Sequence, residues 1–467
     1  MPRRTTDVTN VQMAYMMIIR VAIRSPLMFI FSIIMAFIMS PRLAWIFVIV
    51  LPVLIGGLIL IISKAVPFFN RIFKKYDAMN ESVQENVKAM RVVKAYVRED
   101  YESEKFRKTS DNVRADFTKA ERLLALNTPL MQLCMYIVML IVAYFGARLA
   151  VETSGSAFNV ENLQAMINYS TMCLMSLMML SMVVAMITMS AASARRICEV
   201  LTEESSLKSP ENALTDVENG EIVFDHVSFK YSETAEKFAL KDIDLVIRSG
   251  ETIGILGDTG SSKTTLVNLI PRLYDATEGT VFVGGHDVRK YDLETLRNQI
   301  SVVLQKNVLF SGTIKENLRW GDKEATDEEM VRVCKLAQAD EFIQGLPDKY
   351  DTYIEQGGTN VSGGQKQRLC IARALLKKPK VLILDDSTSA VDTKTDALIR
   401  KAFREEIPDT TKIIIAQRVA SVQDADKIVI MNNGEIDAIG THEELLKNNE
   451  IYRDLYNTQH RGGEENA

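Results

Sequence analysis

The organisation of this chain follows from one stretch of its sequence, Gly254-Ile255-Leu256-Gly257-Asp258-Thr259-Gly260-Ser261-Ser262-Lys263-Thr264-Thr265. Apolar residues over 252–256 predict a strand, the small residues after them predict a loop, and a helix is expected to begin at Lys263. The stretch matches the phosphate-binding loop pattern G-x-x-x-x-G-K-[ST], except that Ser262 occupies the place of the second glycine. Backbone N–H groups of such a loop, together with the helix N-terminus, form an anion site. The stretch therefore predicts phosphate binding between a strand and a helix.

Two side chains of this loop carry specific expectations. Lys263 should reach the outer phosphates of a nucleotide, and Thr264 should ligate Mg²⁺. The alternative is an ordinary turn between strand and helix, which a Lys-Thr pair at the helix start disfavours. The candidate nucleotide-binding residues of the loop are Gly257, Asp258, Thr259, Gly260, Ser261, Ser262, Lys263, Thr264 and Thr265.

The composition divides the chain into two halves. Its 467 residues suffice for two or three domains, and the net charge of −5 gives no basic face for nucleic acid. Twenty of the 22 methionines precede residue 192, as do the long uncharged apolar runs. The five cysteines show no C-x-x-C spacing, so they predict buried or incidental thiols rather than a metal site or a disulfide framework.

Four apolar runs in the first half predict membrane spans, at about 25–41, 43–63, 123–147 and 163–194. Each run is close to the ~20 residues that a helix needs to cross about 30 Å of hydrocarbon. Buried helices of a soluble protein are the alternative, which four such runs within 200 residues disfavour. Only Arg42 separates the first two runs, which predicts a tight helical hairpin.

The charges of the loops predict the orientation of these spans. Residues 64–125 carry fourteen Lys and Arg, whereas residues 151–162 carry none. Basic loops face the cytoplasm, so both chain ends are expected inside. Residues 64–122 show helical patterning with few breakers and predict two long cytosolic helices, with a turn near Glu99–Tyr101.

The last predicted span carries a stripe of methionines on one helix face, because they recur at intervals of three and four residues. Methionine is flexible and polarizable, which suits an adaptable cavity wall. Packing against another helix, or contact with lipid, is the alternative. The stripe comprises Met172, Met175, Met179, Met182, Met186 and Met189.

The second half predicts an α/β domain. Residues 201–219 are polar and contain a proline, which indicates a linker. Alternating strand and helix patterns follow over 220–458 and predict a mainly parallel sheet. Residues 459–467 are expected to be a disordered tail.

A second cluster of motifs lies in this half. Val361-Ser362-Gly363-Gly364-Gln365 precedes the apolar run Val381-Leu382-Ile383-Leu384, which ends in Asp385-Asp386 and is followed by Ser389-Ala390-Val391-Asp392. In this order and spacing the chain resembles the ATP-binding cassette (ABC) transporters. The resemblance implies a multi-domain chain: an all-α transmembrane domain over 1–200, then an α/β P-loop nucleotide-binding domain with a helical subdomain.

The resemblance also implies a role for each motif. Tyr231 would stack on adenine, and Gln305 would sense Mg²⁺ and link to the membrane part. Asp385 would lie on the Mg²⁺ side of the nucleotide, so that Thr264, Gln305 and Asp385 form the metal set. Residues 389–392 would cross a dimer interface. The signature that would reach the nucleotide of the opposite subunit comprises Ser362, Gly363, Gly364 and Gln365.

The family's exporters have six spans and short cytosolic coupling segments. Thr5–Asn10 resembles the first coupling segment and Tyr96–Glu104 the second, so the four predicted spans correspond to the third through sixth. On this expectation the first two spans are absent from the sequence. A truncated gene and a misplaced start codon are the two explanations.

Three positions depart from the family's catalytic pattern. Asp386 stands where the family has a glutamate that polarises the attacking water, and its carboxylate is withdrawn by about 1.5 Å. Gln417 stands where the family has a histidine near the γ-phosphate, and an amide cannot carry a positive charge. Ser262 replaces a glycine and is expected to narrow the range of backbone conformations that the loop can adopt. Tolerated drift in an active enzyme is the alternative.

Together these features predict a plasma-membrane, multi-pass subunit of an ATP-driven exporter of small amphipathic compounds. Its nucleotide-binding domain would be cytoplasmic, with ATP and Mg²⁺ as cofactors. The lipid bilayer and a second half-transporter that carries the consensus Glu and His would be its partners, and its own site would be impaired in hydrolysis. A regulatory ABC protein that does not pump, and a non-functional gene fragment, are the alternatives.

Overall fold

The structure is a computed structural model that describes residues 2–152, 158–386 and 391–464. The chain divides into two compact units, Met1–Glu204 and Ser205–Ala467. The boundary lies inside the predicted linker, just after the last long helix ends at Leu201. Each unit has its own hydrophobic core, and each is described by itself.

The N-terminal unit is entirely helical within its described residues. Long helices form because the apolar runs contain few breakers, and the prolines inside α3, Pro52 and Pro67, are tolerated as they commonly are in membrane helices. Its elements are α1 (Pro2–Met17), the π-helical η1 (Ile18–Ala22), α2 (Arg24–Met39), α3 (Pro41–Ala95), α4 (Glu99–Ala125), α5 (Asn127–Glu152) and α6 (Val160–Leu201).

Among the described residues, four helical segments are long and apolar enough to cross a membrane, and each overlaps a predicted span. The predicted break between the first two spans is present, but it lies at Ser40 rather than at Arg42: α2 ends at Met39, Ser40 adopts extended backbone with φ −159°, and Pro41 opens α3. Proline suits the first helical position because its missing N–H would have had no partner there. The segments are Asp7–Met39, Pro41–Ala65, Glu99–Glu152 and Val160–Val184.

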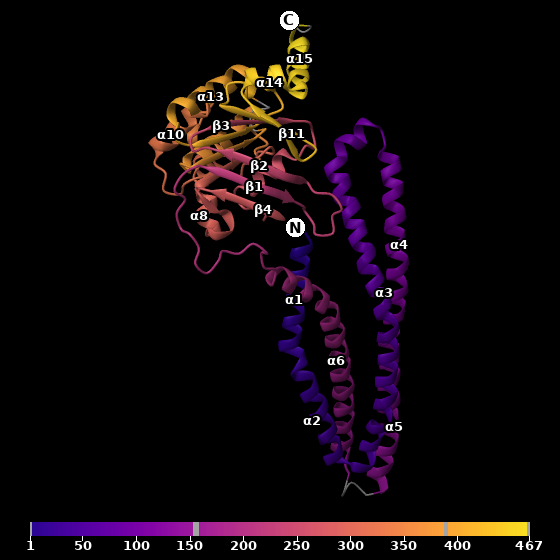
Figure 1. Ribbon diagram of the computed structural model, residues 1–467. Helices are drawn as coiled ribbons and strands as arrows, with labels where there is room; N and C mark the ends of the chain where they lie inside the picture. The colour runs from indigo at the N-terminus through magenta and orange to yellow at the C-terminus, as the bar shows by residue number, and fades with distance from the viewer. Residues whose placement is uncertain (1, 153–157, 387–390, 465–467) are drawn as a thin grey trace. The chain divides into compact units, whose positions relative to one another are not determined.

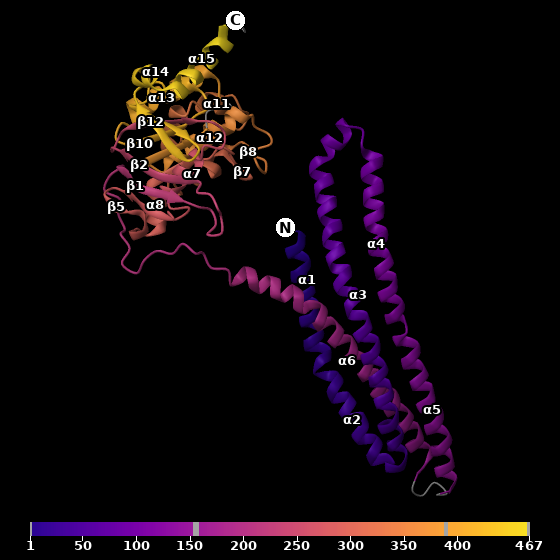
Figure 2. The same cartoon turned by 45° about the vertical axis from the view of Figure 1, so that its right-hand side comes forward.

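The helices of this unit pack side by side. α1 and α2 lie along α6, α3 lies beside α4 and α5, and α5 also packs against α6 (Figure 1, Figure 2). Buried apolar side chains, mainly of α3, α5 and α6, form the core. Two ion pairs join different helices: Lys75 Nζ of α3 lies 2.7 Å from Asp116 Oδ2 of α4, and Arg196 of α6 pairs with the buried Asp7 of α1.

Two details of the N-terminal unit differ from expectation. The turn between the long helices lies at 96–98, a few residues before Glu99–Tyr101, and α4 already begins at Glu99. Thr5–Asn10 do not form a separate short segment but belong to α1, which packs against α6. A local pattern of polar residues did not reveal this, because the packing partner lies almost two hundred residues away.

The C-terminal unit is an α/β fold (Figure 1). It has a six-stranded sheet in the order β12-β11-β3-β10-β9-β6 and an antiparallel sheet in the order β2-β1-β4-β5. The strands are β1 (Ile222–Phe229), β2 (Leu240–Ile247), β3 (Thr252–Gly257), β4 (Glu278–Val283), β5 (His286–Asp287), β6 (Ile300–Val303), β7 (Gly312–Thr313), β8 (Tyr353–Ile354), β9 (Val381–Asp385), β10 (Thr411–Ile415), β11 (Lys427–Asn432) and β12 (Glu435–Gly440).

Helices cover this sheet and build a helical region beside it. They are α7 (Lys263–Leu269), η2 (Val288–Lys290), α8 (Leu293–Gln299), α9 (Ile314–Leu318), α10 (Asp327–Leu336), α11 (Asp340–Gln344), η3 (Lys349–Asp351), α12 (Gly363–Leu376), α13 (Thr393–Glu406), η4 (Val419–Ser421), α14 (His442–Asn448) and α15 (Glu450–Glu464). Because α15 continues to Glu464, the expectation of a disordered tail from residue 459 is wrong for residues 459–464.

The six-stranded sheet is buried on both faces. Successive residues of a strand point to opposite faces. In β9, Val381 and Ile383 belong to the core shared with the antiparallel sheet, whereas Leu382 and Leu384 belong to the core under the helical region. A strand that is buried on both sides is uniformly apolar, which explains the uninterrupted run before Asp385.

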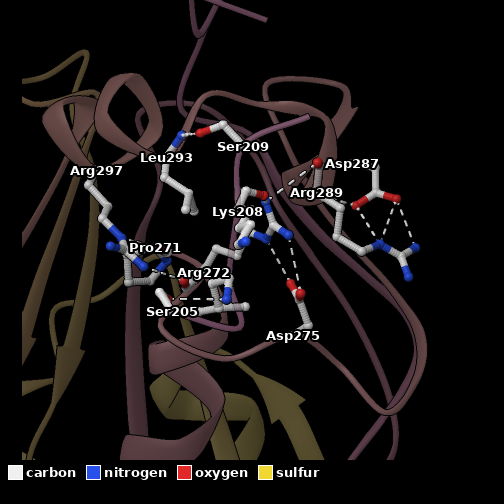
Figure 3. Close-up of polar contacts among 11 residues, drawn as sticks. Ser205, Lys208, Ser209, Pro271, Arg272, Asp275, Asp287, Arg289, Leu293 and Arg297 are labelled. Atoms are coloured by element: carbon white, nitrogen blue, oxygen red, sulfur yellow. Dashed lines mark hydrogen bonds and ion pairs between the residues drawn. The ribbon is translucent and has the colours of Figure 1, made fainter. Parts of the chain in front are cut away.

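The predicted linker is attached to the C-terminal unit rather than free. Arg272 Nη1 donates to the carbonyl oxygen of Lys208 at 3.3 Å, and the Leu293 N–H donates to Ser209 Oγ at 3.0 Å (Figure 3). Ser209 Oγ itself donates to Asp292 Oδ1 at 2.9 Å. Further along, the Leu214 N–H donates to the Lys290 carbonyl oxygen at 2.9 Å. Side-chain and backbone hydrogen bonds to the folded unit thus take the place of regular structure in this segment.

Candidate functional site

Four strands bring the predicted site residues to one edge of the sheet. The phosphate-binding loop follows β3, Gln305 follows β6, Asp385 ends β9, and Gln417 follows β10. β3, β10, β9 and β6 are neighbours and run parallel. Their carboxyl ends therefore meet, as in other open α/β sheets, where ligands bind at this edge.

The phosphate-binding loop has the backbone conformations that its glycines allow. Gly257 has φ +151°, and a Cβ there would lie 2.2 Å from the Met431 carbonyl oxygen. Ser262, in the place of the missing glycine, has φ +70° and ψ 23°, which is the left-handed region. This conformation costs a residue with a Cβ about 1–2 kcal/mol. The loop thus keeps the backbone shape of a loop with glycine at this position, and the free-energy cost of that shape arises at Ser262.

The Lys263 side chain folds back over this loop. Its Nζ donates to the carbonyl oxygens of Gly257 at 2.7 Å and Asp258 at 2.8 Å, and to Ser261 Oγ at 3.2 Å. Burial is the largest influence on the Lys263 ammonium and lowers its pKa, against the attraction of nearby acids. These oxygens hold a charged group over the loop, at the place where phosphate oxygens are expected.

Thr264 and Asp385 form a pair of oxygen ligands beside the loop. Thr264 Oγ1 donates to Asp385 Oδ2 at 2.9 Å, and Asp385 is only 4% exposed. Burial raises the pKa of the Asp385 carboxyl, and the hydrogen bond from Thr264 opposes that shift. Magnesium prefers hydroxyl and carboxylate oxygens of this kind. The donor set therefore fits Mg²⁺.

The side chain of Asp386 is held by two amides. Gln417 Nε2 donates to Asp386 Oδ2 at 2.9 Å, and Gln305 Nε2 donates to the same oxygen at 3.3 Å. The backbone of Asp386 has φ +47°, and its N–H donates to the Ile415 carbonyl oxygen at 2.9 Å. Three predicted site residues, Asp386, Gln305 and Gln417, therefore meet at one oxygen, Asp386 Oδ2, which accepts both hydrogen bonds.

Tyr231 lies near the phosphate-binding loop with part of its surface free. It is 57% exposed, and its hydroxyl lies 2.8 Å from Thr265 Oγ1, one residue beyond Thr264 on helix α7. Its ring contacts those of Phe229 and Tyr274 edge to face, with centroids 4.9 and 5.3 Å apart. An exposed aromatic ring tied to the loop's helix has the placement expected of a base-stacking platform.

The signature residues begin helix α12. Ser362 is its N-cap and forms a capping box with Gln365: Gln365 N–H donates to Ser362 Oγ at 3.3 Å, and Ser362 N–H donates to Gln365 Oε1 at 2.9 Å. Gly363 and Gly364 occupy the first turn of the helix, which begins at Gly363. Ser362 and Gly363 are exposed, which leaves the helix N-terminus open to solvent in this chain.

Part of the predicted site lies outside the described residues. Ser389 and Ala390 of the expected interface loop are in that gap, whereas Asp392 is described as the N-cap of α13. One neighbour of the site was not predicted from sequence. Tyr274 contacts Tyr231 although the two are far apart in the chain, and no local motif marks it. The roles assigned to the site residues stay predictions.

Two protein-family models match this chain. Residues 240–389 match the ABC transporter model, and residues 1–178 match the ABC transporter transmembrane region model.

Similar proteins agree with these matches. YfiB of Bacillus subtilis (strain 168), an uncharacterized ABC transporter ATP-binding protein, is 38% identical over 457 residues, which cover 98% of this chain and 78% of that protein. A protein of Staphylococcus aureus (strain NCTC 8325 / PS 47) is named as a multidrug export ATP-binding/permease protein. It is 38% identical over 378 residues, which cover 81% of this chain and 65% of that protein.

A solved structure shares the fold. A bacterial Atm1-family ABC exporter with ATP bound superposes with a TM-score of 0.87 over 97% of this chain and 79% of that chain, at 24% identity. The motifs, the two family models and the relatives all agree. The chain therefore belongs to the ABC transporters, as an exporter half-transporter whose transmembrane and ATP-binding domains are fused in one polypeptide.

Proposed function

We propose that this chain is one subunit of a heterodimeric exporter, and that its own nucleotide site binds MgATP but hydrolyses it slowly. The observation that carries the proposal is a division within the site. Lys263 lies over the phosphate-binding loop and Thr264 donates to Asp385, which supports nucleotide and metal binding. Asp386 and Gln417, which replace the family's glutamate and histidine, are instead hydrogen-bonded to each other.

The binding part of the site fits MgATP. Thr264, Asp385 and Gln305 would hold Mg²⁺, which neutralises phosphate charge when bound. Lys263 would exchange its contacts with loop carbonyl oxygens for contacts with phosphate oxygens. Tyr231 would stack on the adenine. Binding through these groups needs no base and no second subunit's chemistry.

The two residues expected to act in hydrolysis, Asp386 and Gln417, are poorly suited to it. A general base must come within about 2.6–3.2 Å of the proton that it takes. Asp386 is one methylene shorter than glutamate, and its carboxylate accepts hydrogen bonds from the Gln417 and Gln305 amides. An amide at 417 also supplies no positive charge to the γ-phosphate. Slow hydrolysis follows from reach and charge together.

The signature of this chain would serve the partner's nucleotide. Helix α12 has fourteen residues, and its first N–H groups form the kind of site that binds anions. The capping box already occupies the Ser362 hydroxyl as an acceptor, which leaves its proton free to donate toward a phosphate. In the family's head-to-tail dimer this end of the helix meets the opposite nucleotide.

The transported compounds are proposed to be amphipathic. Met175, Met179 and Met182 of α6 are 58%, 45% and 53% exposed within this chain. The Met189 side chain lies outside those that the structure describes. The S. aureus relative's name points to multidrug export. A flexible, polarizable wall accommodates varied apolar shapes, so the stripe would line the path of such compounds across the plasma membrane.

Co-expression tests the proposal. The full chain would be purified together with a candidate partner that carries the consensus Glu and His, and drug-stimulated ATPase would be measured. We expect a stable pair whose ATPase requires the partner's glutamate. Lys263→Ala in this chain is the control for nucleotide binding at the present site. Equal ATPase from this chain alone would overturn the heterodimer and the impaired site together.

A further inference from the structure

We propose that Tyr274 is a positioning residue for ATP, which holds the ring of Tyr231 in the orientation that stacks on adenine. The inference rests on the adenine role of Tyr231 proposed above. Tyr274 follows the phosphate-loop helix α7, whereas Tyr231 follows strand β1, so only the folded domain brings them together.

Three aromatic rings pack against one another here. The Tyr231 and Tyr274 ring centroids are 5.3 Å apart with planes at 86°, and Phe229 lies 4.9 Å from Tyr231 and 5.5 Å from Tyr274. Phe229 is buried at 3% exposure and anchors the cluster in the core. Edge-to-face pairs at these separations are favourable because the positive ring edge meets the negative face.

The cluster fixes Tyr231 at both ends. The ring is restrained by Phe229 and Tyr274, while the hydroxyl is hydrogen-bonded to Thr265, which is itself buried. Tyr231 nevertheless remains 57% exposed, so surface is left for a ligand. A restrained ring with free surface stacks on a base without a further loss of side-chain freedom.

The segment from Arg272 to Asp275, which includes Tyr274, is held by polar contacts of Arg272 with Asp275 and Arg297 (Figure 3). Arg272 Nε and Nη2 donate to the two carboxylate oxygens of Asp275 at 2.8 and 3.2 Å, which closes a turn around Tyr274. Arg297 Nη2 donates to the Arg272 carbonyl oxygen at 2.8 Å. The Arg272 side chain is only 8% exposed and also donates to the Lys208 carbonyl oxygen of the linker. The backbone that presents Tyr274 is therefore fixed from three directions.

The proposed role predicts an effect on ligands that contain a base and none on phosphate alone. Removing a stacking ring weakens binding of a base by about five- to a hundredfold. Removing the edge-to-face neighbour should weaken it by about two- to tenfold. Inorganic tripolyphosphate contacts the phosphate-binding loop without using the aromatic platform. Its affinity should stay unchanged in both cases.

The experiment measures the affinities of the full chain for MgATP and for Mg-tripolyphosphate by calorimetry in lipid nanodiscs. The variants are Tyr231→Ala, Tyr274→Ala and Tyr274→Leu, with Tyr274→Phe as the conservative variant that keeps the ring. Tyr353→Ala, at a 60% exposed tyrosine on β8, is the matched control. Thermal unfolding of each variant checks that the domain is folded, and Tyr274→Leu keeps apolar volume if alanine destabilises it.

We expect Tyr274→Ala and Tyr274→Leu to weaken MgATP alone, and Tyr274→Phe to restore it. Equal weakening of both ligands, or failure of phenylalanine to restore MgATP binding, would overturn the positioning role. If Tyr231→Ala weakens MgATP while the Tyr274 variants bind normally, only the inference about Tyr274 fails. If Tyr231→Ala leaves MgATP binding unchanged, the adenine role of Tyr231 fails and the inference with it.

Discussion

Replacing Asp386 by asparagine distinguishes a hydrogen-bond acceptor from a catalytic base. Loss of a working general base lowers turnover about 10²- to 10⁴-fold, which corresponds to roughly 3–5.5 kcal/mol of barrier. In this structure the carboxylate accepts from Gln417 at 2.9 Å and from Gln305 at 3.3 Å. An asparagine carbonyl oxygen can keep the shorter bond. The cost should then appear as about 1–2 kcal/mol of folding stability, since bonds from amides to a charged acceptor are worth that much more than neutral ones.

The assay compares turnover, MgATP affinity and thermal stability of the exporter complex with and without Asp386→Asn. We expect turnover to change by less than about threefold, because in the proposed function Asp386 does not accept a proton in the transition state. Lys263→Ala serves as the reference for lost nucleotide binding at this site. Gln417→Ala is the matched variant, since it removes the 2.9 Å donor and leaves the carboxylate in place.

One result would refute this reasoning. A fall in turnover of a hundredfold or more in Asp386→Asn, with MgATP affinity intact, would identify Asp386 as a working base. The hydrogen bonds from Gln305 and Gln417 would then describe only the nucleotide-free arrangement.

Four further predictions concern other parts of the chain. Burial raises the pKa of the Asp385 carboxyl, so it takes a proton at a higher pH than an ordinary aspartate and the Mg²⁺-dependent part of ATP affinity should be lost on acidification. Asp385→Asn should remove this dependence on pH. A Mg²⁺-dependent affinity that is constant down to about pH 4 would contradict the prediction. Ser362→Arg should nearly abolish ATPase of the complex while leaving MgATP bound at this chain's own loop, and near-normal turnover with intact assembly would exclude a role for the signature in the partner's site. Cysteines at Met175 and Met182 should react with water-soluble thiol reagents in at least one nucleotide state, and protection in every state would place the stripe against lipid or another helix. Ser262→Gly should raise thermal stability by about 0.5–1 kcal/mol, since it removes a left-handed residue with a Cβ at the expense of some chain entropy, and an unchanged or lower unfolding midpoint would show that φ +70° carries no strain there.

Much of the fold could be predicted from the sequence because its signals are short-range. The length of hydrocarbon fixes the length of a span, so contiguous apolar residues identified four helices that the structure contains. The two-sided burial of β9 likewise makes an uninterrupted apolar run before Asp385. Local signals failed where distant packing decides. Thr5–Asn10 are absorbed into α1 by its contact with α6, and the polar linker is tied down by Arg272.

The sequence by itself therefore determined the domain order, the spans and the phosphate-binding loop, since each depends on neighbours within about twenty residues. Tertiary structure alone decided which side chains meet. The parallel order of β3, β10, β9 and β6 places Gln305 and Gln417 on one oxygen of Asp386, and the packing of the antiparallel sheet beside α7 places Tyr274 against Tyr231. No local pattern encodes strand order, because it is set by the burial of both sheet faces at once. The contacts on which the proposed separation of ATP binding from hydrolysis rests arise at that level.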